Sequence, residues 1–180
     1  MTFPWRDDPQ LAGRFHSDYA DDLQVLVHDG GPRVSNCRAE LVWARIVGVT
    51  DGVYSAKVLN RPVHLKTVKQ ADAIQFLVTP TCKHPIRVTA KYLKERSQWT
   101  IHPCDKCGFA ELFDAPSDLI RIIFPNLAAG SSMTMFSTFC PLCGGAQVAE
   151  NIAVAAEMRE RKERKWWQFW KISNRKRGNR

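Results

Sequence analysis

Two cysteine pairs of the chain have the spacing of metal ligands. Cys104 and Cys107 form one C-x-x-C turn, Cys140 and Cys143 form another, and a glycine follows each pair directly. Two intervening residues let a tight turn direct both sulfurs at one ion, and the glycine supplies a left-handed backbone conformation without a Cβ clash. The four thiolates therefore predict a closed, tetrahedral site for one structural zinc ion (Zn2+), with no open position for a substrate.

The cysteines also admit other interpretations. A single C-x-x-C pair that opens a helix would indicate a thioredoxin-like dithiol, whereas here two pairs are each followed by glycine. The 32 residues between Cys107 and Cys140 exceed the spacing of a compact zinc ribbon, so an inserted element is expected between the pairs. Cys37 and Cys82 stand alone and are interpreted as buried thiols, although Cys82 and His84 have a ligand-like spacing that leaves a second metal site as an alternative.

The C-terminal segment combines positive charge with tryptophan. Residues 159–180 hold ten Lys or Arg and two Glu, whereas residues 1–158 hold sixteen of each sign, so the formal net charge of +8 comes from this tail. On a helix, its aromatic side chains form a short apolar face bordered by basic residues. The residues predicted to contact a membrane or a partner are Lys165, Trp166, Trp167, Phe169, Trp170 and Lys171.

Several kinds of partner suit such a tail. Tryptophan rings with nearby Lys or Arg favour the headgroup layer of an anionic membrane, and the same side chains suit a protein partner. Nucleic acid is an alternative, because basic groups bind phosphates and tryptophan stacks on bases, but no recognition fold is evident around the tail. The aromatic face could also pack on the protein's own barrel.

Short strands with tight connections are predicted before the first cysteine pair. Residues 41–50 and 53–60 are β-prone runs joined by Asp51-Gly52, a dipeptide that accepts positive φ and is typical of a hairpin. Alternating apolar residues elsewhere add further strands, which together favour a small, twisted, partly closed barrel. The remaining predicted strands of the barrel are residues 22–28, 74–78 and 86–89.

Helices and strands are also expected around the cysteine pairs. Residues 114–118 offer cap residues before an apolar run that Pro125 ends, so a two-turn helix is predicted between the pairs. The other expected elements are a helix at residues 90–96, strands at 99–102, 133–139 and 147–152, and a helix from about residue 150 into the tail.

The predicted fold class is α+β, with a small antiparallel β-barrel-like domain, a zinc-ribbon-like module and a C-terminal amphipathic helix. The expected domains are an extended N-terminal surface segment (1–20), the barrel (21–100), the four-cysteine zinc-binding module with its inserted helix (101–150) and the basic, Trp-rich helix or tail (151–180). No signal peptide pattern or transmembrane span is evident. We expect a cytoplasmic protein with reduced thiols, with peripheral attachment to the inner membrane as an alternative.

No catalytic motif is recognised in the sequence. No P-loop, nucleophile elbow or dinucleotide fingerprint occurs in a suitable context. The nearest candidate for a site is His28-Asp29-Gly30-Gly31, which is interpreted as a β-turn. The chain is therefore interpreted as a non-enzymatic, zinc-stabilised binding or adaptor protein. A hydrolase or transferase with an unrecognised site and an immunity-type inhibitor of a partner enzyme are the alternatives.

A known family shares a pattern that is formed here, in this order, by Trp43, Asn60, Pro62 and Asp72. The pattern runs from a Trp-bearing strand to Asn-x-Pro and then to Gly-Asp before another strand, and through it residues 22–80 resemble the YegJ-like bacterial family of domains of unknown function. The chain has Ala56 and Ala71 where that family often has glycine. Residues 101–148 resemble the zinc-knuckle extension of some relatives. The resemblance implies a small barrel and a bacterial or phage origin, and it implies no activity.

Overall fold

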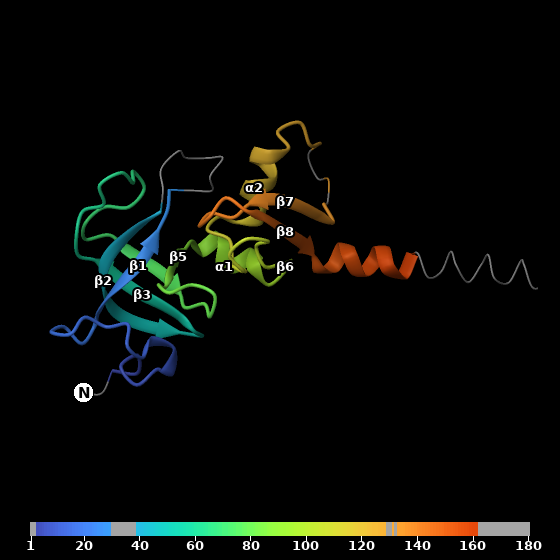
Figure 1. Cartoon of the computed structure of the whole chain (residues 1–180). Coiled ribbons are helices and arrows are strands. Elements are labelled where there is room, and N and C mark those ends of the chain that lie inside the picture. The colour runs from blue at the N-terminus through green and yellow to red at the C-terminus, as the bar shows by residue number, and fades with distance from the viewer. Residues whose placement is uncertain (1–2, 30–38, 129–130, 132, 162–180) are drawn as a thin grey trace, which may run out of the picture.

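The computed structural model describes residues 3–29, 39–128, 131 and 133–161, and it contains two β-sheets (Figure 1). The first sheet is a closed five-stranded barrel in which each strand pairs with the next along the chain. The predicted small barrel is therefore confirmed. Its strands are β1 (Asp22–Val27), β2 (Glu40–Thr50), β3 (Val53–Val58), β4 (Ala73–Leu77) and β5 (Ile86–Val88).

The barrel is closed by a contact that the sequence did not predict. Four neighbouring pairs are antiparallel, but β1 and β5 run parallel, with Leu26 opposite Ile86. The N–H of Leu26 donates to the carbonyl of Pro85 at 2.8 Å. The expectation of an antiparallel, partly closed barrel is corrected in these two respects, because β5 fills the position between β4 and β1 and leaves no open edge.

The hairpin of β2 and β3 follows the predicted turn chemistry. Asp51 and Gly52 have φ values of 51° and 75°, and both conformations match a turn that follows the right-handed twist of paired strands. The register shifts between Ile46 and Gly48, which is the position of a β-bulge. The hairpin is therefore fixed by its local sequence.

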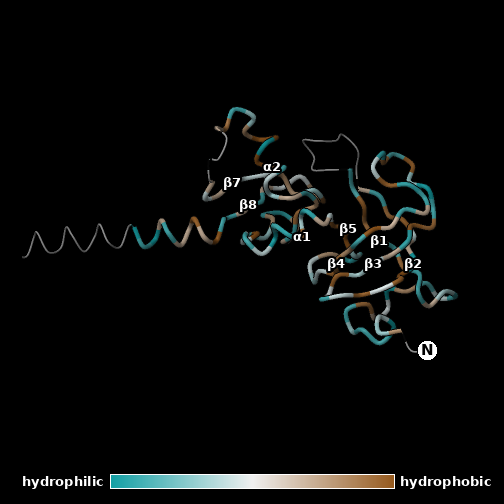
Figure 2. The backbone as a smooth tube through the Cα atoms, turned by 180° about the vertical axis from the view of Figure 1, so that it is seen from behind, coloured by the Kyte–Doolittle hydropathy of each residue, from teal (hydrophilic) through white to brown (hydrophobic). Residues whose placement is uncertain are grey.

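The interior of the barrel is apolar, as the alternation in its strands predicts. Leu23, Val25 and Val27 of β1 are all fully buried, and Tyr54 and Phe76 stack in the core with ring centroids 4.9 Å apart. Figure 2 shows the hydrophobic segments of the barrel strands. This core stabilises the barrel by removing apolar surface from water, and none of the described cysteines belongs to it.

The N-terminal segment differs from the expectation of an extended surface lead-in. It contains a 3-10 helix, η1 (Pro9–Leu11), and both Trp5 and Leu11 are buried in the barrel core. The indole N–H of Trp5 donates to Asp21 at 2.8 Å, and the guanidinium of Arg6 pairs with the same carboxylate at 2.7 Å. The segment lacks a regular hydrophobic period, but its single apolar residues still remove surface from water.

The second sheet carries the two cysteine turns. It has the order β6 (Trp99–Ile101), β8 (Ala146–Asn151) and β7 (Met135–Phe139), and both pairs are antiparallel. The helices α1 (Ala90–Arg96) and α2 (Pro116–Ile123) lie beside it (Figure 1). Since β6 pairs with β8, the second sheet begins just before the expected domain boundary at residue 100.

The helix α2 is capped in a way that the sequence did not indicate. Its N-cap is Ala115, whose side chain makes no capping hydrogen bond, and Pro116 opens the first turn. The carboxylate of Glu95 in α1 instead accepts hydrogen bonds from the backbone N–H of Ser117 at 2.9 Å and from its hydroxyl at 2.7 Å. A side chain from a neighbouring helix therefore takes the role expected of residues 114–118.

A second apolar cluster joins the barrel to the cysteine-bearing sheet. It includes Ile86 and Val88 of β5 together with Phe109 and Phe113 from the segment between the cysteine pairs. The ring of Phe113 also lies against His28, with centroids 5.4 Å apart. The two sheets thus share one packed interface.

The described part of the C-terminal segment is helical over residues 152–161 and leads away from the second sheet (Figure 1). The six tail residues predicted to bind a membrane or a partner, 165–167 and 169–171, lie outside the described residues. In the described part of the chain, no helix has the length and apolar character needed to cross a membrane.

Candidate metal centre

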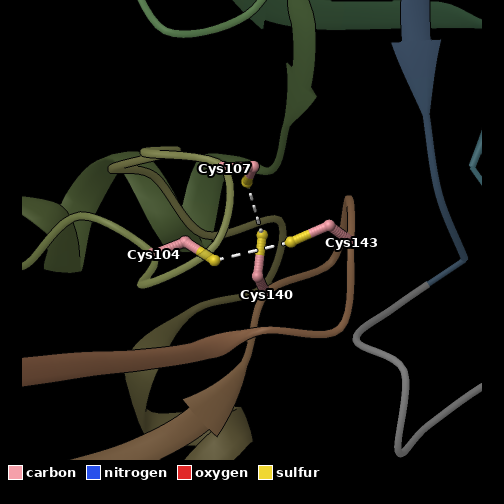
Figure 3. A group of neighbouring side chains, drawn as sticks. All are labelled: Cys104, Cys107, Cys140 and Cys143. Atoms are coloured by element: carbon pink, nitrogen blue, oxygen red, sulfur yellow. Dashed lines mark hydrogen bonds between the residues drawn. The ribbon is translucent and has the colours of Figure 1, made fainter.

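The four predicted cysteines lie together, with their sulfurs directed at a common point (Figure 3). All four Sγ atoms are within 4.8 Å of one another. The Sγ atoms of Cys104 and Cys143 are 3.5 Å apart, and those of Cys107 and Cys140 are 3.6 Å apart. A tetrahedron with metal–sulfur bonds of about 2.3 Å requires sulfur separations of about 3.8 Å. The four thiols are therefore close enough to hold one metal ion.

Each cysteine pair lies in a tight turn that a glycine ends. The N–H of Gly108 donates to the carbonyl of Cys104 at 3.0 Å, and the N–H of Gly144 donates to that of Cys140 at 2.9 Å. The two glycines have φ values of 73° and 71°, a conformation that side chains rarely adopt. The predicted reason for glycine after each pair is confirmed.

Backbone hydrogen bonds fix both turns. The N–H of Cys104 donates to the carbonyl of Phe109 at 2.9 Å, and the N–H of Cys140 donates to that of Gly145 at 2.8 Å. One turn follows β6 and the other joins β7 to β8, so the pairing of β6 with β8 brings them together. The second sheet thereby converts two distant C-x-x-C motifs into one cluster.

Asp105 links the two turns directly, and sequence reasoning missed this role. Its N–H donates to the carbonyl of Ala146 at 3.1 Å, while its carboxylate accepts from the N–H of Ala146 at 2.8 Å. These bonds hold the first turn against the start of β8. An acidic residue directly after the first cysteine was the available signal, because Asp commonly accepts bonds from nearby backbone in turns.

Gly145 allows the closest approach of the two turns. A Cβ atom at this position would lie 2.5 Å from Oδ1 of Asp105 and 2.7 Å from Sγ of Cys104. Both distances are far below ordinary van der Waals contact. Glycine is therefore required here by space, in contrast to Gly144, where backbone conformation is the reason.

The four thiols differ in environment. Cys104 and Cys140 are buried, whereas Cys107 and Cys143 are exposed. Burial raises the pKa of Cys140. Burial also opposes ionisation of Cys104, but hydrogen bonds from the backbone N–H groups of Cys107 and Lys106 outweigh it and lower the pKa of Cys104 to about 7. A bound cation would displace the remaining protons, since cysteine ligates a metal ion as the thiolate.

The other predicted ligands do not join this cluster. Cys82 is half-buried, and neither it nor His84 belongs to a metal-binding group among the described residues. Cys37 lies outside the described residues. The donor set at the centre is therefore four sulfurs.

Comparisons with protein-family models, curated proteins and solved structures found no match to this chain. The resemblance of residues 22–80 to the YegJ-like family stays a prediction.

Proposed function

We propose that the chain is a zinc-stabilised binding protein and not an enzyme, with zinc held by Cys104, Cys107, Cys140 and Cys143 in a zinc-ribbon-like module. The observation that carries the proposal is the approach of all four Sγ atoms to within 4.8 Å of one another. Tetrahedral sites with four thiolates are typical of structural zinc. Such a site has no open position at the ion, so its contribution is to folding and not to catalysis.

A bound ion would join the two cysteine turns, which the short second sheet holds together only weakly. The outer strand β6 has only three residues, and the described chain between the two cysteine pairs includes one helix, α2, before it reaches β7. Four metal–sulfur bonds would join the turn after β6 to the turn between β7 and β8. Isolated zinc-finger peptides gain on the order of 10 kcal/mol from such binding, which is enough to order a small module.

Metal analysis of purified, reduced protein tests the zinc proposal. We expect one zinc per chain in the wild type and a loss of most of it in Cys104→Ser. Cys82→Ser is the matched control, because Cys82 lies outside the cluster, and it should retain one zinc. Full zinc content in Cys104→Ser, or iron in place of zinc in the wild type, would contradict the proposal.

The binding partner that we propose for the tail is an anionic membrane surface. Residues 166, 167 and 170 are tryptophans that lie among Lys and Arg. Residues 1–158 have a formal net charge of zero, so the positive charge that would attract an anionic surface comes from the tail. Trp rings are favoured at the headgroup layer, and each nearby Lys or Arg contributes about 1 kcal/mol at an anionic surface.

Vesicle sedimentation tests the tail. The full chain should sediment with anionic vesicles and release as salt is raised, while a chain that ends at residue 161 should stay in solution. Vesicles with zwitterionic lipids and a short single-stranded oligonucleotide serve as comparisons. Equal binding by both chains, or preference of the full chain for the oligonucleotide, would overturn the membrane proposal.

A further inference from the structure

A cavity of about 140 Å³ lies where the barrel meets the cysteine-bearing module. Its barrel side is formed by His28 and Asp29 after β1, by Thr67 and by Arg87 of β5, and its other side by Phe113 and Asp114 before α2. Both halves of the protein therefore contribute polar and aromatic side chains to one pocket. It is separate from the four cysteines.

Arg87 supplies the positive charge of this cavity. It is half-buried, and its Nη1 makes long contacts, 3.4 Å to the carbonyl of His28 and 3.3 Å to the hydroxyl of Thr67. Burial lowers the pKa of Arg87, although Asp29 and Asp114 act in the opposite direction. A guanidinium carries five N–H donors in a planar fork, and arginine binds a carboxylate through two of them at once. The side chain therefore suits a ligand that brings a carboxylate into the cavity.

The acidic residues of the cavity have different roles. The carboxylate of Asp29 accepts from the backbone N–H groups of Lys66 at 2.7 Å and Thr67 at 2.8 Å, so it holds the loop that carries Thr67. Asp114 lines the opposite side of the cavity, and its Oδ2 is buried. With Arg87, these two aspartates give the lining a formal charge of −1, which disfavours a phosphate or another multiply charged anion.

We propose that the cavity binds a small zwitterion, a free α-amino acid of the size of glycine or alanine. The carboxylate of the ligand pairs with Arg87, its ammonium group pairs with Asp114, and its side chain contacts the ring of Phe113. A zwitterion can pair with both the positive and the negative side chains of the pocket, whereas a simple anion or a simple cation can pair with only one kind.

The size of the cavity supports this class of ligand. A cavity of about 150 Å³ holds a molecule with about six heavy atoms, such as benzene. Alanine has six heavy atoms and glycine has five, whereas larger amino acids would have to extend through the opening. A ligand held between Arg87 and Asp114 would also connect the barrel to the cysteine-bearing module.

An NMR titration of the zinc-loaded full chain tests the proposal with defined probes. L-alanine is compared with propionate, which lacks the ammonium group, with ethylamine, which lacks the carboxylate, and with inorganic phosphate. We expect alanine to shift the amide signals of Thr67, Arg87 and Phe113 and to bind at least about tenfold more tightly than any other probe. No shift at these amides with alanine, or equal or tighter binding of another probe, would overturn it.

Substitutions in the pocket extend the test. Arg87→Gln and Asp114→Asn should each weaken alanine binding by about tenfold or more. Arg45→Gln is the control, because Arg45 does not line the pocket and its exposed side chain pairs with the buried Asp22, and it should leave alanine affinity unchanged. If Arg87→Gln fails to fold, Asp114→Asn and the wild-type titration decide. Zinc content reports on the four cysteines and not on this pocket, so the two proposals fail independently.

Discussion

The barrel and the cysteine-bearing module reach an ordered structure by different means. The barrel pairs every strand on both sides and encloses a continuous apolar core that includes fully buried Tyr54 and Phe76. The module has an open sheet of three strands, and two of its buried residues are Cys104 and Cys140. The barrel therefore depends on hydrophobic packing inside one closed sheet, whereas the module has its own apolar cluster and, under our proposal, depends in addition on a metal ion held by its four sulfurs.

Zinc removal should produce the largest effect and should separate the two regions. Treatment with a chelator, or Cys140→Ser, should increase hydrogen exchange of the amides in β6, β7 and β8 by about a hundredfold or more, because no metal then joins the two turns and only hydrogen bonds hold them together. The amides of β1, β2 and β3 should change much less. Hydrogen exchange read by mass spectrometry measures both regions in one sample. Equal loss of protection in the two sheets would show that the barrel also depends on the metal.

The reverse experiment weakens the barrel and leaves the metal in place. Phe76→Ala should lower the free energy of unfolding of the barrel by about 3–5 kcal/mol, because it removes a fully buried ring that stacks on Tyr54. Denaturant unfolding followed by tryptophan fluorescence measures the change. Zinc content should remain at one per chain. Loss of the zinc together with the barrel would mean that the two regions fold as a single unit.

A smaller change should act on the metal centre alone. Gly145→Ala places a Cβ atom against Asp105 and Cys104, so zinc affinity should fall about 10- to 100-fold. Competition with a chelator of known affinity measures this. Gly48→Ala is the matched control, because a Cβ at Gly48 meets nothing within 4 Å and the residue lies in a barrel strand. Unchanged zinc affinity in Gly145→Ala would contradict the close approach of the two turns.

The smallest expected effect concerns the N-terminal segment on the barrel. Hydrogen bonds from Arg6, opposed in part by burial and supported by Trp5, lower the pKa of Asp21 from 3.8 to about 2. A depressed carboxyl pKa contributes stability that is present above about pH 4 and lost as pH falls through 2. Asp21→Asn should thus be less stable than wild type at pH 5, and the difference should shrink towards pH 2.

Thermal unfolding at several pH values measures the difference. Asp18→Asn is the control, because the Asp18 side chain is 77% exposed. It should unfold at the same temperature as the wild type at every pH. If the difference in unfolding temperature between wild type and Asp21→Asn stayed constant from pH 5 to pH 2, the ionised form of Asp21 would not be the cause of that difference.

Features that depend on local sequence could be predicted, and these include the candidate metal site. The β2–β3 hairpin follows from Asp51-Gly52, and the two turns follow from C-x-x-C and the glycine after each pair. Both rest on backbone conformations that a few adjacent residues determine. That the two cysteine pairs lie close together could be inferred only from the expectation that their four thiols bind one metal ion.

Features that depend on contacts between distant residues could not be predicted. The burial of Trp5, the parallel pairing of β1 with β5 and the capping of α2 by Glu95 each join segments that the sequence does not connect. The cavity around Arg87 is a further case, since its two sides come from separate parts of the fold. At His28-Asp29 the sequence predicts only a β-turn.

X-ray absorption at the zinc edge, on protein purified without added metal, tests the central claim most directly. Four sulfur neighbours at about 2.3 Å and one zinc per chain are the predicted result. Protein without zinc, or zinc bound through nitrogen and oxygen in place of one or more sulfurs, would contradict the account.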